Sequence, residues 1–328
     1  MVDGMTSSHV DSDIASGSGR VVPTPSNGRN LSVARRARSV LQATRPRQWL
    51  KNVLVFAAPA AAGSITHLGL LGHAVAAFWI FVAASSCTYL INDVVDRDSD
   101  RRHPVKRSRP IASGELAPVT AISVAAVLGA ASIAGATLIG TSLALITGAY
   151  LVVTLAYSLG LKRVPLVELA CVGSGFTFRA VAGGAATHVP ISPWFLVMTS
   201  FGALFIVVGK RSSEKSVLGT RQGLHRKVLD SYPTALLGAL RVLAISVTVA
   251  TYCLWAFERA DQLRRIDRAA GLIWFELSIV PFVLAVLVLE RAFERGRGGQ
   301  PEELALSDHL LQFLGIAWVV LLLCGIYA

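Results

Sequence analysis

The feature that most constrains this chain is a series of apolar stretches, each about as long as a membrane is thick. A bilayer core roughly 30 Å deep requires about 20 apolar residues per helix. Such stretches follow one another from Trp49 to the end of the sequence, separated by short polar connections. They predict an all-α integral membrane protein with about nine transmembrane helices bundled around a polar cavity that faces the cytoplasm. The expected spans lie near 51–70, 74–92, 117–138, 141–160, 166–187, 192–209, 234–257, 270–290 and 309–327.

Composition excludes a soluble domain of any size. Of the 328 residues, 53% are hydrophobic and only 16% are charged, and the mean hydropathy is +0.57. Residues 1–44 are rich in Ser, Gly, Pro and Arg, so we expect a disordered basic tail there, followed by a transmembrane catalytic domain over 45–328. The span at 51–70 is the weakest, because Gly63, Ser64 and Thr66 interrupt its apolar run.

The net charge of +11 is distributed unevenly along the chain. Lys and Arg concentrate in every second connection between spans, which predicts a multi-pass plasma-membrane protein with its N-terminus and active site in the cytoplasm. The four arginines of the connection at 258–268 break this pattern, so the orientation of that loop stays open. We expect this charge to bind membrane lipids and an anionic substrate, and not nucleic acid. Composition leaves the oligomeric state open, a homo-oligomer included.

The most informative motif is Asn-Asp-Val-Val-Asp-Arg-Asp-Ser-Asp at 92–100, where the second expected span ends. On a helix, Asp93, Asp96 and Asp100 share one face, and Asn92 lies one turn before Asp96. Carboxylates gathered in this way repel one another unless a cation binds between them. Mg²⁺ takes oxygen ligands and often combines one or two carboxylates with substrate phosphates. The motif therefore predicts Mg²⁺ on these four residues, with an exposed loop of mixed charge as the alternative.

Several charged residues near this motif or inside spans are candidate substrate ligands. Glu168 and Arg179 lie eleven residues apart in one span, which places them on one helix face. An ionisable residue at such depth suggests a function, although Arg179 could instead pair within the bundle and Arg241 could reach the membrane surface. After the acidic motif come cations that could contact a diphosphate or could simply determine topology: Lys106, Arg107 and Arg109.

Three segments together resemble the UbiA-type superfamily of intramembrane prenyltransferases. The motif at 92–100 contains the superfamily's complete first aspartate-rich pattern, NDxxDxxxD. The runs Arg-Pro-Arg-Gln-Trp-Leu-Lys-Asn at 45–52 and Tyr-Ser-Leu-Gly-Leu-Lys at 157–162 are also similar to that superfamily. The resemblance covers about residues 45–328 and implies a helical bundle that uses Mg²⁺ to bind a diphosphate.

The superfamily's second aspartate-rich motif is missing. The corresponding loop reads Gly-Lys-Arg-Ser-Ser-Glu-Lys at 209–215, so cations replace the expected anions. With the segments at 255–259 and 301–306, this loop resembles an actinobacterial branch that transfers 5-phosphoribose from 5-phosphoribosyl 1-diphosphate to decaprenyl phosphate. The resemblance implies that reaction, with decaprenylphosphoryl-5-phosphoribose and diphosphate as products for cell-wall arabinan. Two alternatives remain: prenyl transfer from a polyprenyl diphosphate to an aromatic acceptor, and a transporter.

The resemblance also implies roles for individual residues. Asp93 and Asp96 would be catalytic through the metal, with Tyr157 and Lys162 beside them, although Tyr157 and Lys162 could instead be an interface aromatic and a topology charge. Arg179 is a candidate for the lipid phosphate. Glu214 could contact the metal or form an ion pair with its neighbours. The remaining implied substrate ligands are Lys51, Asn52, Glu168, Lys210, Arg211, Lys215 and Arg241, of which Lys210, Arg211 and Lys215 are assigned to the donor's 5-phosphate.

Overall fold

The computed structural model describes residues 33–218, 230–265, 272–299 and 301–327, and every regular element in these ranges is helical. This confirms the predicted all-α membrane fold. The eight helices long and apolar enough to cross a membrane are α3 (Leu68–Val95), α6 (Pro118–Ile139), α7 (Thr141–Leu159), α8 (Val167–Thr187), α9 (Pro193–Leu218), α11 (Thr234–Arg265), α12 (Leu272–Glu294) and α14 (His309–Tyr327).

The span expected at 51–70 is not a single α-helix, which corrects that prediction. Its residues form a 3-10 helix η1 (Pro46–Phe56), a short α2 (Ala57–Ala61) and a second 3-10 turn η2 (Ser64–Thr66). With three residues per turn, η1 places Asn52 and Val55 on one buried face, and Ala58 in α2 continues it. The segment still runs along the bundle, because Arg45 contacts Asp93 at one end and Gly63 adjoins Ile326 at the other.

The predicted tail also needs correction at its C-terminal boundary. Residues 1–32 lie outside the described residues, but Val33–Ala43 forms helix α1. Ser39 and Ala43 are buried, and Ala43 packs in an apolar cluster with Leu90 and Ile111. The apolar positions of this short helix thus find a surface to pack against, which composition alone did not reveal.

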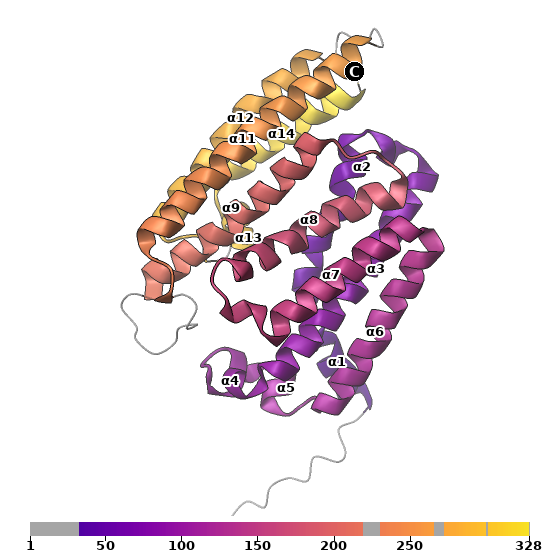
Figure 1. The fold of residues 1–328 in the computed structure, drawn as a ribbon, viewed down its shortest axis with the longest axis vertical. Helices are drawn as coiled ribbons and strands as arrows, with labels where there is room; N and C mark the ends of the chain where they lie inside the picture. The colour runs from indigo at the N-terminus through magenta and orange to yellow at the C-terminus, as the bar shows by residue number, and fades with distance from the viewer. Residues whose placement is uncertain (1–32, 219–229, 266–271, 300, 328) are drawn as a thin grey trace, which may run out of the picture.

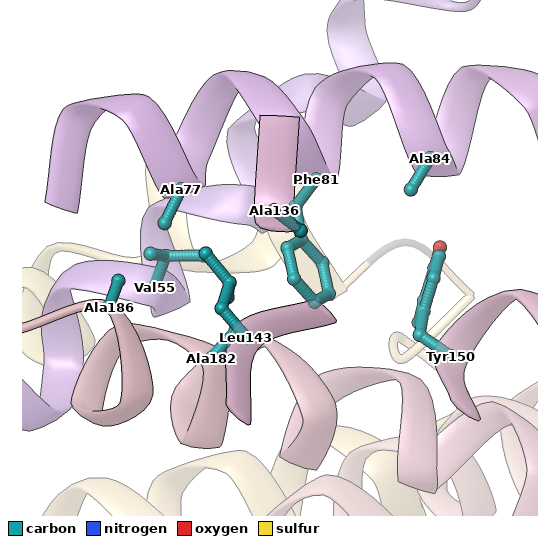
Figure 2. Packing of buried hydrophobic residues seen from close by; sticks show 9 residues of the cluster. All are labelled: Val55, Ala77, Phe81, Ala84, Ala136, Leu143, Tyr150, Ala182 and Ala186. Atoms are coloured by element: carbon teal, nitrogen blue, oxygen red, sulfur yellow. The ribbon is translucent and has the colours of Figure 1, made fainter. Parts of the chain in front are cut away.

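The bundle consists of two neighbouring groups of helices (Figure 1). In the first group α3, α6, α7 and α8 pack together with η1 against α3 and α8, and in the second α9, α11, α12 and α14 lie side by side; α8 and α9 join the groups. The core of the first group brings Val55, Phe81, Leu143 and Tyr150 together (Figure 2), and the rings of Phe81 and Tyr150 are 5.2 Å apart. Because consecutive spans run in opposite directions, α3, α7, α9 and α12 all end on the same side.

We call that side the aspartate end, since it carries residues 92–100. The connection from α3 to α6 folds there into α4 (Arg97–Arg102), η3 (Lys106–Ser108) and α5 (Pro110–Ser113). The connection from α7 to α8 adds η4 (Leu161–Arg163), and α13 (Pro301–Ser307) precedes α14. The fold therefore gathers at one end the polar connections that the sequence separates by long apolar helices.

Gly183 allows η1 to pack directly against α8. A Cβ atom on Gly183 would lie 1.7 Å from the carbonyl oxygen of Val55, whereas one on Gly238 in α11 would meet nothing within 4 Å. We predict that Gly183→Ala lowers the free energy of unfolding by about 1–3 kcal/mol or more through overpacking. Thermal denaturation in detergent measures this effect, with Gly238→Ala as the matched control. Equal melting of the two variants would contradict the close approach.

Candidate functional site

The predicted aspartate cluster forms where α3 gives way to α4. Asn92 and Asp93 lie in the last turn of α3, Asp96 separates the two helices, and Asp100 lies in α4. Asp93 and Asp100 are each only 3% exposed, whereas Asp98 points outward with its side chain 84% exposed. The structure therefore brings Asp93 and Asp100 together on Arg109, brings Asn92 and Asp96 together on Lys162, and leaves Asp98 in solvent.

Three cations from separate parts of the chain neutralise the three carboxylates. Arg109 Nη1 lies 3.0 Å from Asp93 Oδ1 and 2.6 Å from Asp100 Oδ2. Lys162 Nζ, in η4, lies 2.5 Å from Asp96 Oδ1, and Arg45 also pairs with Asp93. An unpaired carboxylate buried this deeply would be strongly destabilising, so these ion pairs explain how the cluster folds.

The donor atoms of this cluster suit a hard divalent cation. Lys162 Nζ lies 3.4 Å from Asn92 Oδ1 and 2.5 Å from Asp96 Oδ1, so two oxygens converge on one positive charge. Asp93 and Asp100 converge in the same way on Arg109 Nη1. Within the described residues no three Asp, Glu, His or Cys side chains form a ready metal site. Substrate phosphate oxygens would therefore have to complete a Mg²⁺ shell here, which is its usual mode of binding.

Arg45 is the main residue that sequence reasoning missed. Its backbone is left-handed, with a φ of 55°, a conformation that costs a non-glycine residue free energy. The turn directs the guanidinium onto Asp93 and places it 5.1 Å from the centre of the Tyr89 ring. Arg45 opens the segment at 45–52 that carried part of the family resemblance, so a signal was present in the sequence.

A second ionic cluster forms between the start of α8 and the end of α9. Glu168 is fully buried and accepts two hydrogen bonds from Arg211, from Nε at 2.9 Å and from Nη2 at 2.8 Å. Arg211 Nη1 also donates to Glu214 at 2.8 Å. Tyr157 lies close enough to interact electrostatically with Arg211. Arg211 was predicted to bind phosphate, and Glu214 was predicted either to bind the metal or to form an ion pair. In the structure both residues belong to an ion-pair network.

Tyr232 and Lys215, which lie beside this second cluster, form hydrogen bonds with backbone groups. The Tyr232 hydroxyl accepts a hydrogen bond of 2.7 Å from the backbone N–H of Leu166, and burial raises the pKa of Tyr232. Leu166 has a φ of 64°, so the turn into α8 is held in a strained conformation beside Glu168. Lys215 donates to the carbonyl oxygen of Tyr232.

Arg179 lies deeper in the bundle and is 5% exposed. Its guanidinium donates to Asn52 Oδ1 at 2.7 Å, to the carbonyl oxygen of Gly175 at 2.5 Å and to the Tyr150 hydroxyl at 3.1 Å. No carboxylate lies within 4 Å of it in the described part of the chain. Arg179 and Glu168 share a helix as expected, but each has found a different partner.

The other predicted ligands lie in several places at or near the aspartate end. Lys106 and Arg107 are in η3, where Arg107 is exposed. The Nδ1 atom of nearby His103 accepts hydrogen bonds from the backbone N–H groups of Val105 and Lys106, each at 3.2 Å. Partial burial is the main cause that lowers the pKa of His103, and the positive charge of Lys106 lowers it further. Lys51 Nζ is 5.9 Å from the centre of the Phe176 ring, and Lys210 is in the last third of α9.

Arg241 belongs to a separate group of charges in the second helix group. It pairs with Glu290 at 3.2 Å and with Glu294, and it donates to Ser212 at 2.9 Å. These contacts fasten α9, α11 and α12 together. Arg241 was predicted to bind substrate, and in the structure it contacts Glu290, Glu294 and Ser212, which hold helices in place.

Comparison with known proteins identifies the class to which this fold and site belong. The UbiA prenyltransferase family matches residues 53–293, which cover the aspartate cluster, η4 and the end of α9. The chain belongs to the UbiA prenyltransferase family, and it is a multi-pass membrane protein.

Within that family, the chain is similar to curated proteins from actinobacteria. It is 43% identical over 284 residues to the decaprenyl-phosphate phosphoribosyltransferase of Mycobacterium tuberculosis, covering 85% of this chain and 91% of that protein. It is 40% identical over 296 residues to the decaprenyl-phosphate phosphoribosyltransferase of Corynebacterium glutamicum, covering 89% of this chain and 87% of that protein.

A solved structure supports the fold. A UbiA homolog from Archaeoglobus fulgidus, bound to DMAPP and Mg²⁺, superposes with a TM-score of 0.64 over 88% of this chain and 97% of that one. The sequences are 19% identical, so the likeness shows a shared fold alone.

The buried Glu168–Arg211 pair provides a stability test. Glu168→Gln removes the fully buried charge and leaves Arg211, 6% exposed, with only Glu214 beside it. Breaking a buried pair costs about 3–5 kcal/mol, so the variant should melt at a clearly lower temperature in detergent. The double variant Glu168→Leu, Arg211→Met should recover part of that loss. A single variant that melts like the parent protein would contradict the inferred role of the pair.

Proposed function

We propose that this protein transfers 5-phosphoribose from 5-phosphoribosyl 1-diphosphate to decaprenyl phosphate. The products are decaprenylphosphoryl-5-phosphoribose and diphosphate. The observation that carries the proposal is the set of ion pairs at the end of α3, in which Asp93, Asp96 and Asp100 are paired with Arg45, Arg109 and Lys162. A metal diphosphate needs both kinds of group. The names of the actinobacterial relatives support decaprenyl phosphate as the acceptor and a phosphoribosyl group as the group transferred.

The cluster can receive the leaving diphosphate by exchanging partners. Mg²⁺ held by Asn92, Asp93, Asp96 and Asp100 would supply positive charge to the diphosphate oxygens as the bond at ribose C1 breaks. Arg109 and Lys162, each now shared between two oxygens of the protein, would then donate to phosphate oxygens instead. The cations that neutralise the carboxylates would thus become ligands of the leaving group.

The acceptor needs positioning more than deprotonation. The second pKa of a phosphate monoester is about 6, so the lipid phosphate is already largely ionised at neutral pH. It would attack C1 from the side opposite the diphosphate, forming the new C–O bond as the old one breaks. Arg179, a buried cation with three uncharged partners, is our candidate to attract that phosphate.

The end of α9 would bind the 5-phosphate of the donor. Lys210 and Lys215 lie there where other superfamily members are expected to carry aspartates. Arg211 is held by Glu168 and Glu214 and would position its neighbours. This division of labour separates a metal-bound diphosphate from a lysine-bound monophosphate.

We further propose that the aspartate end faces the cytoplasm. The connection after α3 carries six cations, Arg97, Arg101, Arg102, Lys106, Arg107 and Arg109, and the positive-inside rule places such loops on the cytoplasmic side. A charged, water-soluble sugar diphosphate is also available there.

The substrates can be tested in one assay. Membranes containing the protein are given radiolabelled 5-phosphoribosyl 1-diphosphate, decaprenyl phosphate and Mg²⁺, and the lipids are extracted. We predict labelled lipid that disappears when a chelator removes Mg²⁺. Absence of labelled lipid, together with transfer from a polyprenyl diphosphate to an aromatic acid, would establish the alternative reaction instead.

The metal ligands can be tested by single substitutions in the same motif. Asp93→Asn and Asp96→Asn keep the side-chain shape but remove the charge that a metal requires. Loss of the metal would remove several kcal/mol of transition-state stabilisation and should reduce the transfer rate by about a hundredfold or more. Asp98→Asn, on the exposed side, is the matched control and should retain activity. Comparable rates in Asp93→Asn and Asp98→Asn would remove the metal assignment.

A further inference from the structure

A cavity lies at the end of the bundle opposite the aspartate end. It has a volume of about 300 Å³ and is bounded by α2, the connection at 189–193 and the last turns of α11. Helix α8 starts beside η4 and ends just before this connection, so its 21 residues separate the two sites by about 30 Å. The cavity includes Trp255, Glu258 and Arg259, which belong to a segment that the proposed reaction does not use.

Two opposite charges, Glu258 and Arg259, line this cavity without forming an ion pair with each other. Arg259 donates to Gln262 Oε1 at 2.8 Å and to the carbonyl oxygen of Ala61 at 3.1 Å. Glu258 accepts a short hydrogen bond from Ser192. Among the described residues, neither side chain has an opposite charge within 4 Å. Neutral neighbours therefore hold each charge in place, and both retain capacity to bind a ligand.

The hydrogen-bonding capacity of these groups defines the ligand. Two of the five N–H donors of Arg259 are used in the bonds to Gln262 and Ala61, so three remain, and a guanidinium binds phosphate through paired N–H groups. The carboxylate of Glu258 has further lone pairs for an ammonium group. A ligand with a phosphate and an amine a few atoms apart satisfies both, whereas a purely anionic ligand would be repelled by Glu258.

The walls of the cavity indicate where such a ligand comes from. Apolar side chains of Ala58, Ile191, Phe195 and Trp255 surround the charges. The cavity lies at the end of helices that cross the membrane, which is the level at which phospholipid head groups are found. Tryptophan is also enriched at this level. An amphiphile embedded in the bilayer could thus place its head group in the cavity while its chains remain in lipid.

We propose that this cavity is a binding site for a zwitterionic phospholipid, with the lipid phosphate on Arg259 and its ammonium group on Glu258. Phosphatidylethanolamine has this chemistry. The site is separate from the aspartate cluster, and the inference does not depend on the transferase reaction.

The test is lipid binding to the purified, delipidated full-length protein, measured by native mass spectrometry. Phosphatidylethanolamine, phosphatidylglycerol and soluble phosphoethanolamine are the probes. We expect the parent protein to prefer phosphatidylethanolamine. Arg259→Gln should weaken its binding about tenfold, the effect of losing one charged hydrogen-bonded contact. Glu258→Gln should weaken the binding of phosphatidylethanolamine and strengthen the binding of phosphatidylglycerol. Arg264→Gln, on the exposed side of the same helix, is the matched control and should change neither.

Several results would overturn the proposal. Unchanged phosphatidylethanolamine binding in both Arg259→Gln and Glu258→Gln would place the lipid elsewhere. A parent protein that prefers phosphatidylglycerol would make the cavity an anion site. Soluble phosphoethanolamine binding as tightly as the lipid would indicate a water-soluble ligand. If Arg259→Gln fails to fold, Ala62→Phe fills the cavity while keeping both charges, and it should cause the same loss.

Discussion

The structure depends on keeping carboxylates buried at the end of a membrane-spanning helix. Asp93 and Asp100 are almost fully enclosed, which is tolerable only because Arg45, Arg109 and Lys162 neutralise the cluster. These cations come from the turn before η1, from the residue before α5 and from η4. Ion pairing at this one place therefore fixes the positions of three connections, and in the proposed function the same ion pairs are exchanged for a metal and a diphosphate.

The membrane bundle separates two chemical environments along its length. At the aspartate end there are two ionic clusters, one built on α3, α4 and Lys162 of η4 and the other on Glu168 and Arg211. Between the ends, Arg179 is a cation bound only to uncharged groups. At the opposite end, Glu258 and Arg259 keep separate charges in an otherwise apolar cavity. The three regions therefore differ in how their charged side chains are paired: carboxylates and cations pair at the aspartate end, whereas Arg179, Glu258 and Arg259 are held by neutral groups.

The parts of this arrangement that follow local periodicity could be predicted from the sequence. Eight apolar stretches in the described residues form helices long enough to cross a membrane, and Asp93 and Asp100 share Arg109, whereas Asp96 pairs with Lys162. The segment 46–66 was misassigned because its burial repeats every three residues, which an apolar run does not distinguish from an α-helix. Arg45 was missed because its role depends on a left-handed turn and on a contact 48 residues away. The Glu168–Arg211 pair spans 43 residues, so no local pattern could reveal that Arg211 already has a partner.

The proposed reaction requires a metal diphosphate to take the place of the cations at Asp93 and Asp96. The most direct measurement is an experimental structure of the protein with Mn²⁺ and 5-phosphoribosyl 1-diphosphate, in which anomalous scattering locates the metal. The account predicts metal beside Asp93 and Asp96, with Arg109 and Lys162 on phosphate oxygens. Metal and diphosphate bound beside Glu168 and Glu214, with the ion pairs of the aspartate cluster intact, would contradict it.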